Sequence, residues 1–202
     1  MNRPAPKKSR LPTQEPGWRT LLRREVGTAS RLVVLGVGNE ERGDDAAGVL
    51  GLRLLRKSAP HPMRRNVFYL EGGVAPENVT GKIRAFAPSH VLILDAVLGG
   101  RKPGAIFPVK PEKIAEEELT THRLPLSFLM RYLKESIGCR VLCLGIEPFV
   151  LEAGSAVSRP VALAIRTLAR ECASLLGQRR PSARPQRKKT RAKSDPKKRR
   201  RS

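Results

Sequence analysis

The sequence predicts an α/β fold in which a parallel sheet is covered by helices on both faces. Two observations lead to this prediction. Between residues 31 and 176, short apolar runs alternate with longer amphipathic segments, which is typical of successive strand-helix-strand units. Several of the strand-like runs are apolar throughout instead of alternating with polar residues, as in strands that are buried on both faces.

Five apolar runs are expected to form the strands. HVLILDAV and RVLCLGI are almost wholly apolar, which favours central positions in the sheet. AIFPVK contains Pro108, which has no N–H to donate to a neighbouring strand, so this run is expected at an edge. The predicted strands span residues 31–36, 66–70, 90–97, 105–110 and 140–146.

Four amphipathic segments are expected to form the helices. The first has its apolar residues on one face and follows Asp44 and Asp45, acidic residues that suit a helix N-terminus. The last begins with Ser158 as its expected N-cap and has Pro160 in its first turn. The predicted helices span residues 46–57, 76–86, 125–137 and 158–176.

The charge of the chain is concentrated at its two ends. Of 202 residues, 40 are basic and 18 acidic, giving a net charge of +22. Residues 1–30 and 177–202 lack apolar periodicity, so both are expected to be disordered basic extensions around one domain at residues 31–176. That domain has a nearly balanced charge, which excludes a histone-like protein. The tails are expected to bind polyanions weakly and without sequence readout.

The sequence also limits where the protein acts. No run approaches the roughly 18 to 20 apolar residues of a membrane span, and the N-terminal residues lack the apolar core of a secretory signal. We therefore expect a cytoplasmic protein with no membrane partner. Its three cysteines are too few and too irregularly spaced for a disulfide framework, so Cys139, Cys143 and Cys172 are expected to be buried thiols.

The turn after the first predicted strand, GVGNEERGDDAAG (36–48), invites comparison with a dinucleotide-binding turn. The third glycine of the G-x-G-x-x-G pattern is replaced by Glu41, and the other acidic side chains would repel a pyrophosphate. An acidic turn fits a cation or a basic peptide better. The alternative is that Asp44 and Asp45 only cap the following helix.

Two further polar residues lie in loops expected at the same edge of the sheet, where ligands collect in α/β proteins. Asp95 ends an otherwise apolar strand, and His122 lies in TTHRLPL (120–126). Together with a carboxylate of the acidic turn they form a chemically sensible set for nickel or zinc. The structural alternatives are a hydrogen-bonded Asp95 that fixes its loop and a surface His122.

In its motifs the chain resembles the hydrogenase maturation protease family over roughly residues 31–155. These endopeptidases remove a C-terminal extension from the precursor of the NiFe hydrogenase large subunit. The shared GDD, GG-APE and TTH-LPL elements are most similar to the branch that processes hydrogenase 3, of the formate hydrogenlyase type. The five ordered motifs are GVGNEERGDDAAG, EGGVAPEN, LILDAV, TTHRLPL and LCLGIEP.

The resemblance implies a three-layer α/β/α sandwich around a mostly parallel, twisted sheet. It also implies that Asp45, Asp95 and His122 contact nickel already inserted in the precursor. The protease would then read nickel as a checkpoint before it cuts. Because the nickel is carried by the substrate, the free protease is not expected to bind it tightly.

The catalytic chemistry stays open at this point. Nickel is either a recognition element or a Lewis acid, with Asp45 or Asp95 as general base in aspartic or metal-assisted hydrolysis. Glu40-Glu41-Arg42 stands where the family is usually apolar, and Glu71 where it commonly has Asp. A nucleotide-binding module and an inactive scaffold that binds acidic partners through its tails are the alternative functions.

Overall fold

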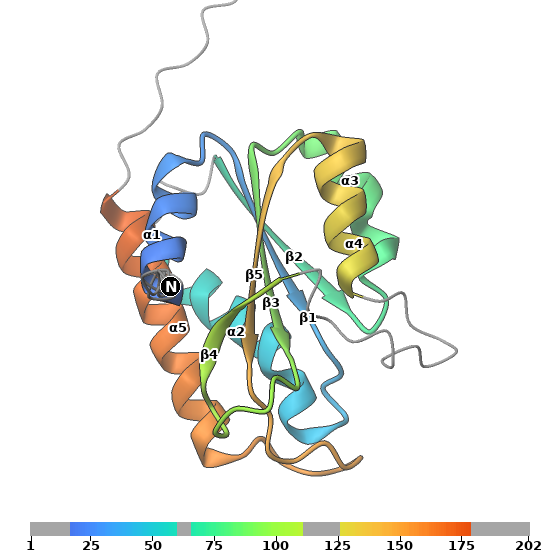
Figure 1. The fold of residues 1–202 in the computed structure, drawn as a ribbon, viewed down its shortest axis with the longest axis vertical. Helices are drawn as coiled ribbons and strands as arrows, with labels where there is room; N and C mark the ends of the chain where they lie inside the picture. Colours follow the sequence, from blue (N-terminus) through green and yellow to red (C-terminus); the bar gives the residue numbers. More distant parts are fainter. Residues whose placement is uncertain (1–16, 60–65, 111–125, 179–202) are drawn as a thin grey trace, which may run out of the picture.

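The computed structural model describes residues 17–59, 66–110 and 126–178, which form a twisted five-stranded sheet between two layers of helices (Figure 1). The sheet order is β2-β1-β3-β5-β4; only β4 runs antiparallel to its neighbour. The expected α/β sandwich with a mostly parallel sheet is therefore confirmed. The strands are β1 Leu32–Val37, β2 Val67–Gly73, β3 His90–Ala96, β4 Ile106–Val109 and β5 Arg140–Ile146.

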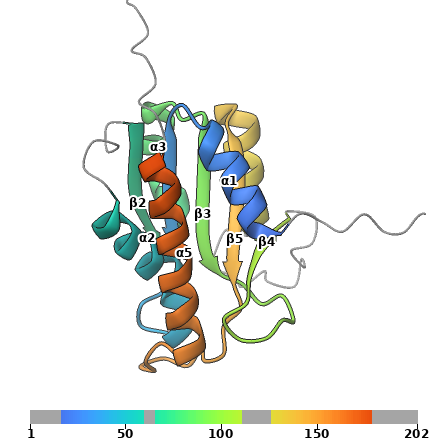
Figure 2. The ribbon, with the colours of Figure 1, turned by 90° about the vertical axis from the view of Figure 1, so that its left-hand side faces the viewer.

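The helices are divided between the two faces of the sheet (Figures 1 and 2). One face carries α1 Trp18–Thr28, α2 Ala47–Ser58 and α5 Arg159–Gln178, and the other carries α3 Thr80–Phe86 and α4 Leu126–Tyr132. Short helical turns extend three of them: η1 Gly43–Ala46 leads into α2, η3 Pro76–Val79 leads into α3, and η6 Leu133–Ile137 continues α4. None of the helices in the described residues combines the length and apolar composition needed to cross a membrane.

Alternation along the strands gives the protein two hydrophobic cores. In β3, Leu92 and Leu94 pack with α1, α2 and α5, whereas Val91 and Ile93 pack with α3 and α4. Successive strand residues point to opposite faces, so a strand that is apolar throughout serves both cores. This explains why the central strands lack the polar alternation of a one-sided sheet.

The edge position expected for the proline-containing strand is also confirmed. β4 is the last strand in the sheet, and Pro108 lies opposite Leu144 of β5. An edge strand has hydrogen-bonding partners on one side only, so a residue without an N–H is tolerated there. All three cysteines are buried and free, as predicted.

One expectation from the sequence was wrong. Within the N-terminal extension, residues 18–28 form helix α1, in which Leu22 and Val26 are fully buried in the core beside α5. The buried carboxylate of Glu25 accepts hydrogen bonds from the guanidinium of Arg140 at 2.9 Å. The helix contains three arginines, which made its two buried apolar positions hard to recognise in the sequence. The folded unit thus begins before residue 31; residues 1–16 and 179–202 lie outside the described chain.

Candidate active site

The turn that joins β1 to α2 is closed by a glycine. Gly38 has φ +133°, and a Cβ atom there would lie 1.8 Å from the carbonyl oxygen of Asp45. The Gly38 N–H donates to the carbonyl of Gly73 at 3.0 Å. The space that the missing side chain leaves is therefore occupied by the backbone of Asp45. This argues against the nucleotide-binding alternative, in which a phosphate group would occupy it.

Asp44 is a structural residue. Its side chain is 0% exposed, and its carboxylate accepts hydrogen bonds from the N–H groups of Phe149, Val150 and Ser158 at 2.7–3.0 Å. The Ser158 hydroxyl donates a fourth, at 2.8 Å. Burial opposes ionisation, but the hydrogen bonds outweigh it and hold the pKa of Asp44 below its usual value. Asp44 thus ties the β5–α5 loop to the acidic turn.

Asp45 and Asp95 are brought to the same edge of the sheet. Asp45 is 8% exposed and lies in η1, which packs against β3; Asp95 is partly buried near the end of β3. A Cβ atom on Gly48 would lie 2.1 Å from the carbonyl oxygen of Leu94, so the start of α2 touches the residue before Asp95. One oxygen of Asp95 accepts a hydrogen bond from the Ala96 N–H at 2.8 Å.

The third predicted site residue, His122, lies outside the described residues. Within residues 17–59, 66–110 and 126–178, no three histidine, cysteine, aspartate or glutamate side chains converge as a metal site. Asp45 and Asp95 can supply carboxylate oxygens, which suit a borderline ion when completed by imidazole or by ligands that a substrate brings.

The cysteines do not supply a nucleophile. Burial raises the pKa of Cys139, and burial together with the charge of Asp95 raises the pKa of Cys143 well above its usual value. Burial, aided by the charge of Glu171, raises the pKa of Cys172 to about 12. Because the thiolate is the reactive form, burial and raised pKa values of the three thiols argue against a cysteine-protease mechanism.

Glu147 is a residue at this edge that sequence reasoning missed. It follows β5 and is buried, and its carboxylate accepts a hydrogen bond from the Gly99 N–H at 2.8 Å. Its own backbone pairs with Gly104 and Ala105. Glu147 therefore fixes the loop that follows β3, the strand that contains Asp95. The signal was present in LCLGIEP, where an acidic residue follows a buried strand directly.

The two departures from the family pattern are joined by one arginine. Arg53 of α2 donates to Glu40 at 2.8 Å and to Glu71 at 2.7 Å. The hydrogen bonds from Arg53 are the main cause that lowers the pKa of Glu71. All three side chains are well exposed, so the network contributes little to stability but connects the acidic turn to the end of β2.

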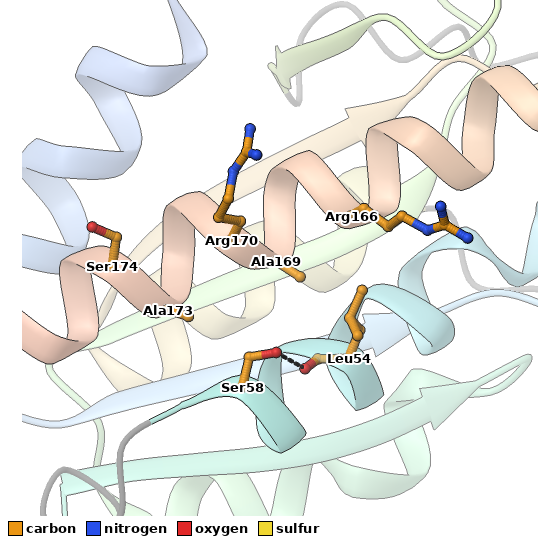
Figure 3. Close-up of a pocket in the computed structure, with 7 residues that line it drawn as sticks. All are labelled: Leu54, Ser58, Arg166, Ala169, Arg170, Ala173 and Ser174. Carbon is orange, nitrogen blue, oxygen red and sulfur yellow. Dashed lines mark hydrogen bonds between the residues drawn. The ribbon is translucent and has the colours of Figure 1, made fainter.

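A surface groove of about 520 Å³ lies elsewhere, between α2 and α5 (Figure 3). Its lining contains no carboxylate, histidine or cysteine, and Arg170 points away from α2. Ser58, at the far end of α2 from η1, lies in its wall. The groove is therefore separate from the candidate site. Its lining residues are Leu54, Ser58, Arg166, Ala169, Arg170, Ala173 and Ser174.

Comparison with known proteins gives consistent results. A sequence model of the hydrogenase maturation protease family matches residues 53–175, which include Asp95 and His122 but begin after Asp45. The hydrogenase 3 maturation protease of Escherichia coli K12 is 41% identical over 137 residues, covering 67% of this chain and 85% of that protein.

Solved structures agree in fold. A NiFe hydrogenase maturation protease from Thermococcus kodakarensis has a TM-score of 0.70 at 32% identity, covering 78% of this chain and 99% of that one. The endopeptidase HycI of Escherichia coli has a TM-score of 0.62 at 37% identity, covering 71% and 90%. The chain thus belongs to the hydrogenase maturation protease family, in agreement with the resemblance in its motifs.

Proposed function

We propose that this protein removes the C-terminal extension of a nickel-loaded NiFe hydrogenase large-subunit precursor. The observation that carries the proposal is the meeting of the Asp45 turn with the end of β3, in a chain of this protease family. The relatives are named as hydrogenase maturation proteases and as an endopeptidase, which supports a hydrolase acting on a protein.

In this proposal, nickel is part of the substrate. Asp45, Asp95 and His122 contact nickel that is held by the precursor, so that only a loaded precursor is oriented for cleavage. Two carboxylates and one imidazole lack the thiolates that hold such ions tightly. The free protease accordingly binds nickel weakly and depends on the precursor to complete the coordination.

A carboxylate is the natural base for the hydrolytic water. The side chain of Asp95 is more exposed than that of Asp45, and one of its oxygens is oriented by the Ala96 N–H. We assign proton abstraction to Asp95, with Asp45 as the carboxylate that meets the metal. Nickel could supply Lewis acidity to the scissile carbonyl when the precursor is bound.

The decisive experiment is cleavage of a nickel-loaded precursor by the purified full chain. Release of a short C-terminal peptide is expected, with no release from the nickel-free precursor. Asp45→Asn, Asp95→Asn and His122→Ala should each suppress cleavage. The two Asn substitutions remove a carboxylate charge at nearly unchanged size, and His122→Ala removes the imidazole ligand. Glu171→Gln on α5, whose partner is Arg19, is the matched control and should cleave normally.

Two results would reject the proposal. Equal cleavage with and without nickel would remove the checkpoint, and full activity of Asp45→Asn would remove the site assignment. A chain that binds polyanions but never cleaves a precursor would instead support the scaffold alternative.

We further propose that the protein acts in the cytoplasm, and that its basic tails bind polyanions weakly.

A further inference from the structure

Exposed apolar side chains gather where the strands end. Among the described residues, five large apolar side chains are about half exposed or more, and three of them closely follow a strand. Leu98 after β3 and Phe149 after β5 have the largest exposed fractions, 63% and 69%. Single exposed apolar residues are ordinary on protein surfaces, but two on neighbouring loops beside a candidate site are informative.

The backbone on both sides of Leu98 is fixed. The Val97 N–H donates to the carbonyl of Ile146 at 3.0 Å, and the Gly99 N–H donates to the carboxylate of Glu147 at 2.8 Å. Leu98 therefore projects from a loop that is bonded to the end of β5. This side chain is held outward in the folded state instead of moving with a loose loop.

Phe149 is held in a similar way, by a second buried carboxylate. Its N–H and that of Val150 donate to one oxygen of Asp44, at 2.8 and 3.0 Å. The carbonyl of Val150 accepts from the Asp44 N–H at 2.8 Å. The loop that exposes Phe149 is therefore fastened to the turn that contains Asp45.

Two buried carboxylates, Asp44 and Glu147, order the loops that carry the exposed side chains. A buried carboxylate is costly unless its hydrogen bonds are satisfied, and here two of them order the backbone at exposed apolar residues. A rigid apolar or aromatic side chain loses little entropy on binding, which is the property of an interface anchor. The other exposed phenylalanine has a local explanation, because Arg131 lies 4.8 Å over the ring of Phe128.

We propose that Leu98 and Phe149 form an apolar anchor pair that docks apolar side chains of the precursor beside the bond to be cut. The inference rests on the proposed function and names the surface that holds the substrate. Leu98 lies three residues after Asp95, and the Phe149 loop is bonded to the residue before Asp45. Both loops are thus continuous with the elements that carry the two carboxylates, and the polypeptide that must approach these carboxylates is the precursor, which makes it the occupant.

The test is steady-state cleavage of the nickel-loaded precursor by variants of the full chain. Leu98→Ser together with Phe149→Ser should raise KM at least about ten-fold, the effect of losing one moderate anchor, while kcat changes less than about two-fold. The single variant Phe149→Leu keeps an apolar surface at this position and should keep a KM close to that of the wild type. The matched control is Leu163→Ser, an apolar side chain of 52% exposure that lies on helix α5 and not in a loop that follows a strand.

The outcomes separate the two proposals. A wild-type KM in the double variant, with cleavage intact, overturns the anchor pair and leaves the protease assignment standing. A wild-type chain that neither binds nor cleaves any precursor overturns both. Loss of wild-type self-association in the double variant, measured by sedimentation, would assign the pair to a second copy of this chain and reject the substrate role. Thermal unfolding of each variant near the wild-type temperature excludes misfolding as the cause of a raised KM.

Discussion

Two adjacent aspartates in one turn have different environments. Asp44 is enclosed and accepts hydrogen bonds from the β5–α5 loop, whereas Asp45 lies at the start of α2 against β3. From composition and spacing alone, both residues could equally cap the following helix. The difference depends on residues more than a hundred positions away in sequence, which no local pattern contains.

Replacement of Asp44 by Asn should destabilise the protein in a pH-dependent way. At pH 7 the loss should be about 2 to 4 kcal/mol, since Asn replaces one acceptor oxygen by an NH2 group that faces a donor and removes the charge that strengthens the remaining hydrogen bonds. The pKa of native Asp44 is lowered, so its contribution is present above the unfolded value near pH ~3.9 and is lost as pH falls through the lower native value. Urea unfolding of both proteins from pH 7 to 3 measures this difference.

The difference in stability between the wild type and Asp44→Asn removes the effect of every other titrating group that the two proteins share. The pKa of Glu71 is also lowered, but Glu71 is present in both proteins and its effect cancels in the difference. The wild-type and Asp44→Asn curves should converge below about pH 4. A difference in stability that stays constant down to pH 3 would contradict the proposed role of the charge.

At the scale of elements, the contact between α2 and β3 sets the geometry of the site. A Cβ atom on Gly48 would lie 2.1 Å from the Leu94 carbonyl oxygen and 2.3 Å from that of Val37. Gly48→Ala must therefore lift the helix start away from two strands. We expect a loss of about 3 kcal/mol or more in urea unfolding, together with reduced cleavage because Asp45 moves relative to Asp95.

Gly51 provides the matched control one turn further along α2. A Cβ atom there would meet only a Leu94 side-chain carbon at 3.6 Å, which is ordinary van der Waals contact. Alanine is a better helix former than glycine, so Gly51→Ala should leave stability unchanged or raise it by about 0.5 to 1 kcal/mol. Equal effects of the two substitutions would show that the helix tolerates displacement.

Helix α1 is the element whose contribution is tested most directly by truncating a core side chain. Leu22→Ala should lower the free energy of unfolding by about 2 to 5 kcal/mol, because the side chain is fully buried between α1 and the rest of the core. Arg23→Ala on the exposed side of the same helix should change it by less than about 0.5 kcal/mol. An unaffected Leu22→Ala protein would mean that α1 is dispensable.

The sequence predicted the strands and most helices because their apolar residues follow the period of the element. β3 and β5 are apolar throughout and occupy central positions, and Pro108 marks the edge strand. Helix α1 was missed because its charged residues interrupt the apolar pattern and only two apolar positions are fully buried in the core. Long-range pairs such as Glu147 with Gly99 could not be predicted, since they arise only when distant loops meet.

Viewed as a whole, the molecule separates its polar clusters between the two edges of the sheet. Asp95 and Glu147 lie at the C-terminal strand ends, the lower side of Figure 1, where α2 and α5 begin. Glu25, His90 and Arg140 meet at the opposite edge, where β3 and β5 begin. The second cluster ties α1 to the sheet, so it is explained by the fold and leaves the first as the candidate site.

The last prediction concerns the charge at the C-terminus. Residues 179–202, outside the described chain, carry most of the net charge of +22, with thirteen basic side chains and one acidic. Binding to a polyanion releases counterions, so affinity for duplex DNA or heparin should fall steeply as salt rises from about 50 to 200 mM. Deleting residues 179–202 should flatten that dependence, and exchanging their Lys and Arg for Gln should do the same at unchanged length.

Cleavage of the nickel-loaded precursor and the thermal unfolding temperature should stay at wild-type values, because the site and both cores lie within residues 17–178. Salt-sensitive binding that persists after the deletion would place the polyanion site on the folded domain instead.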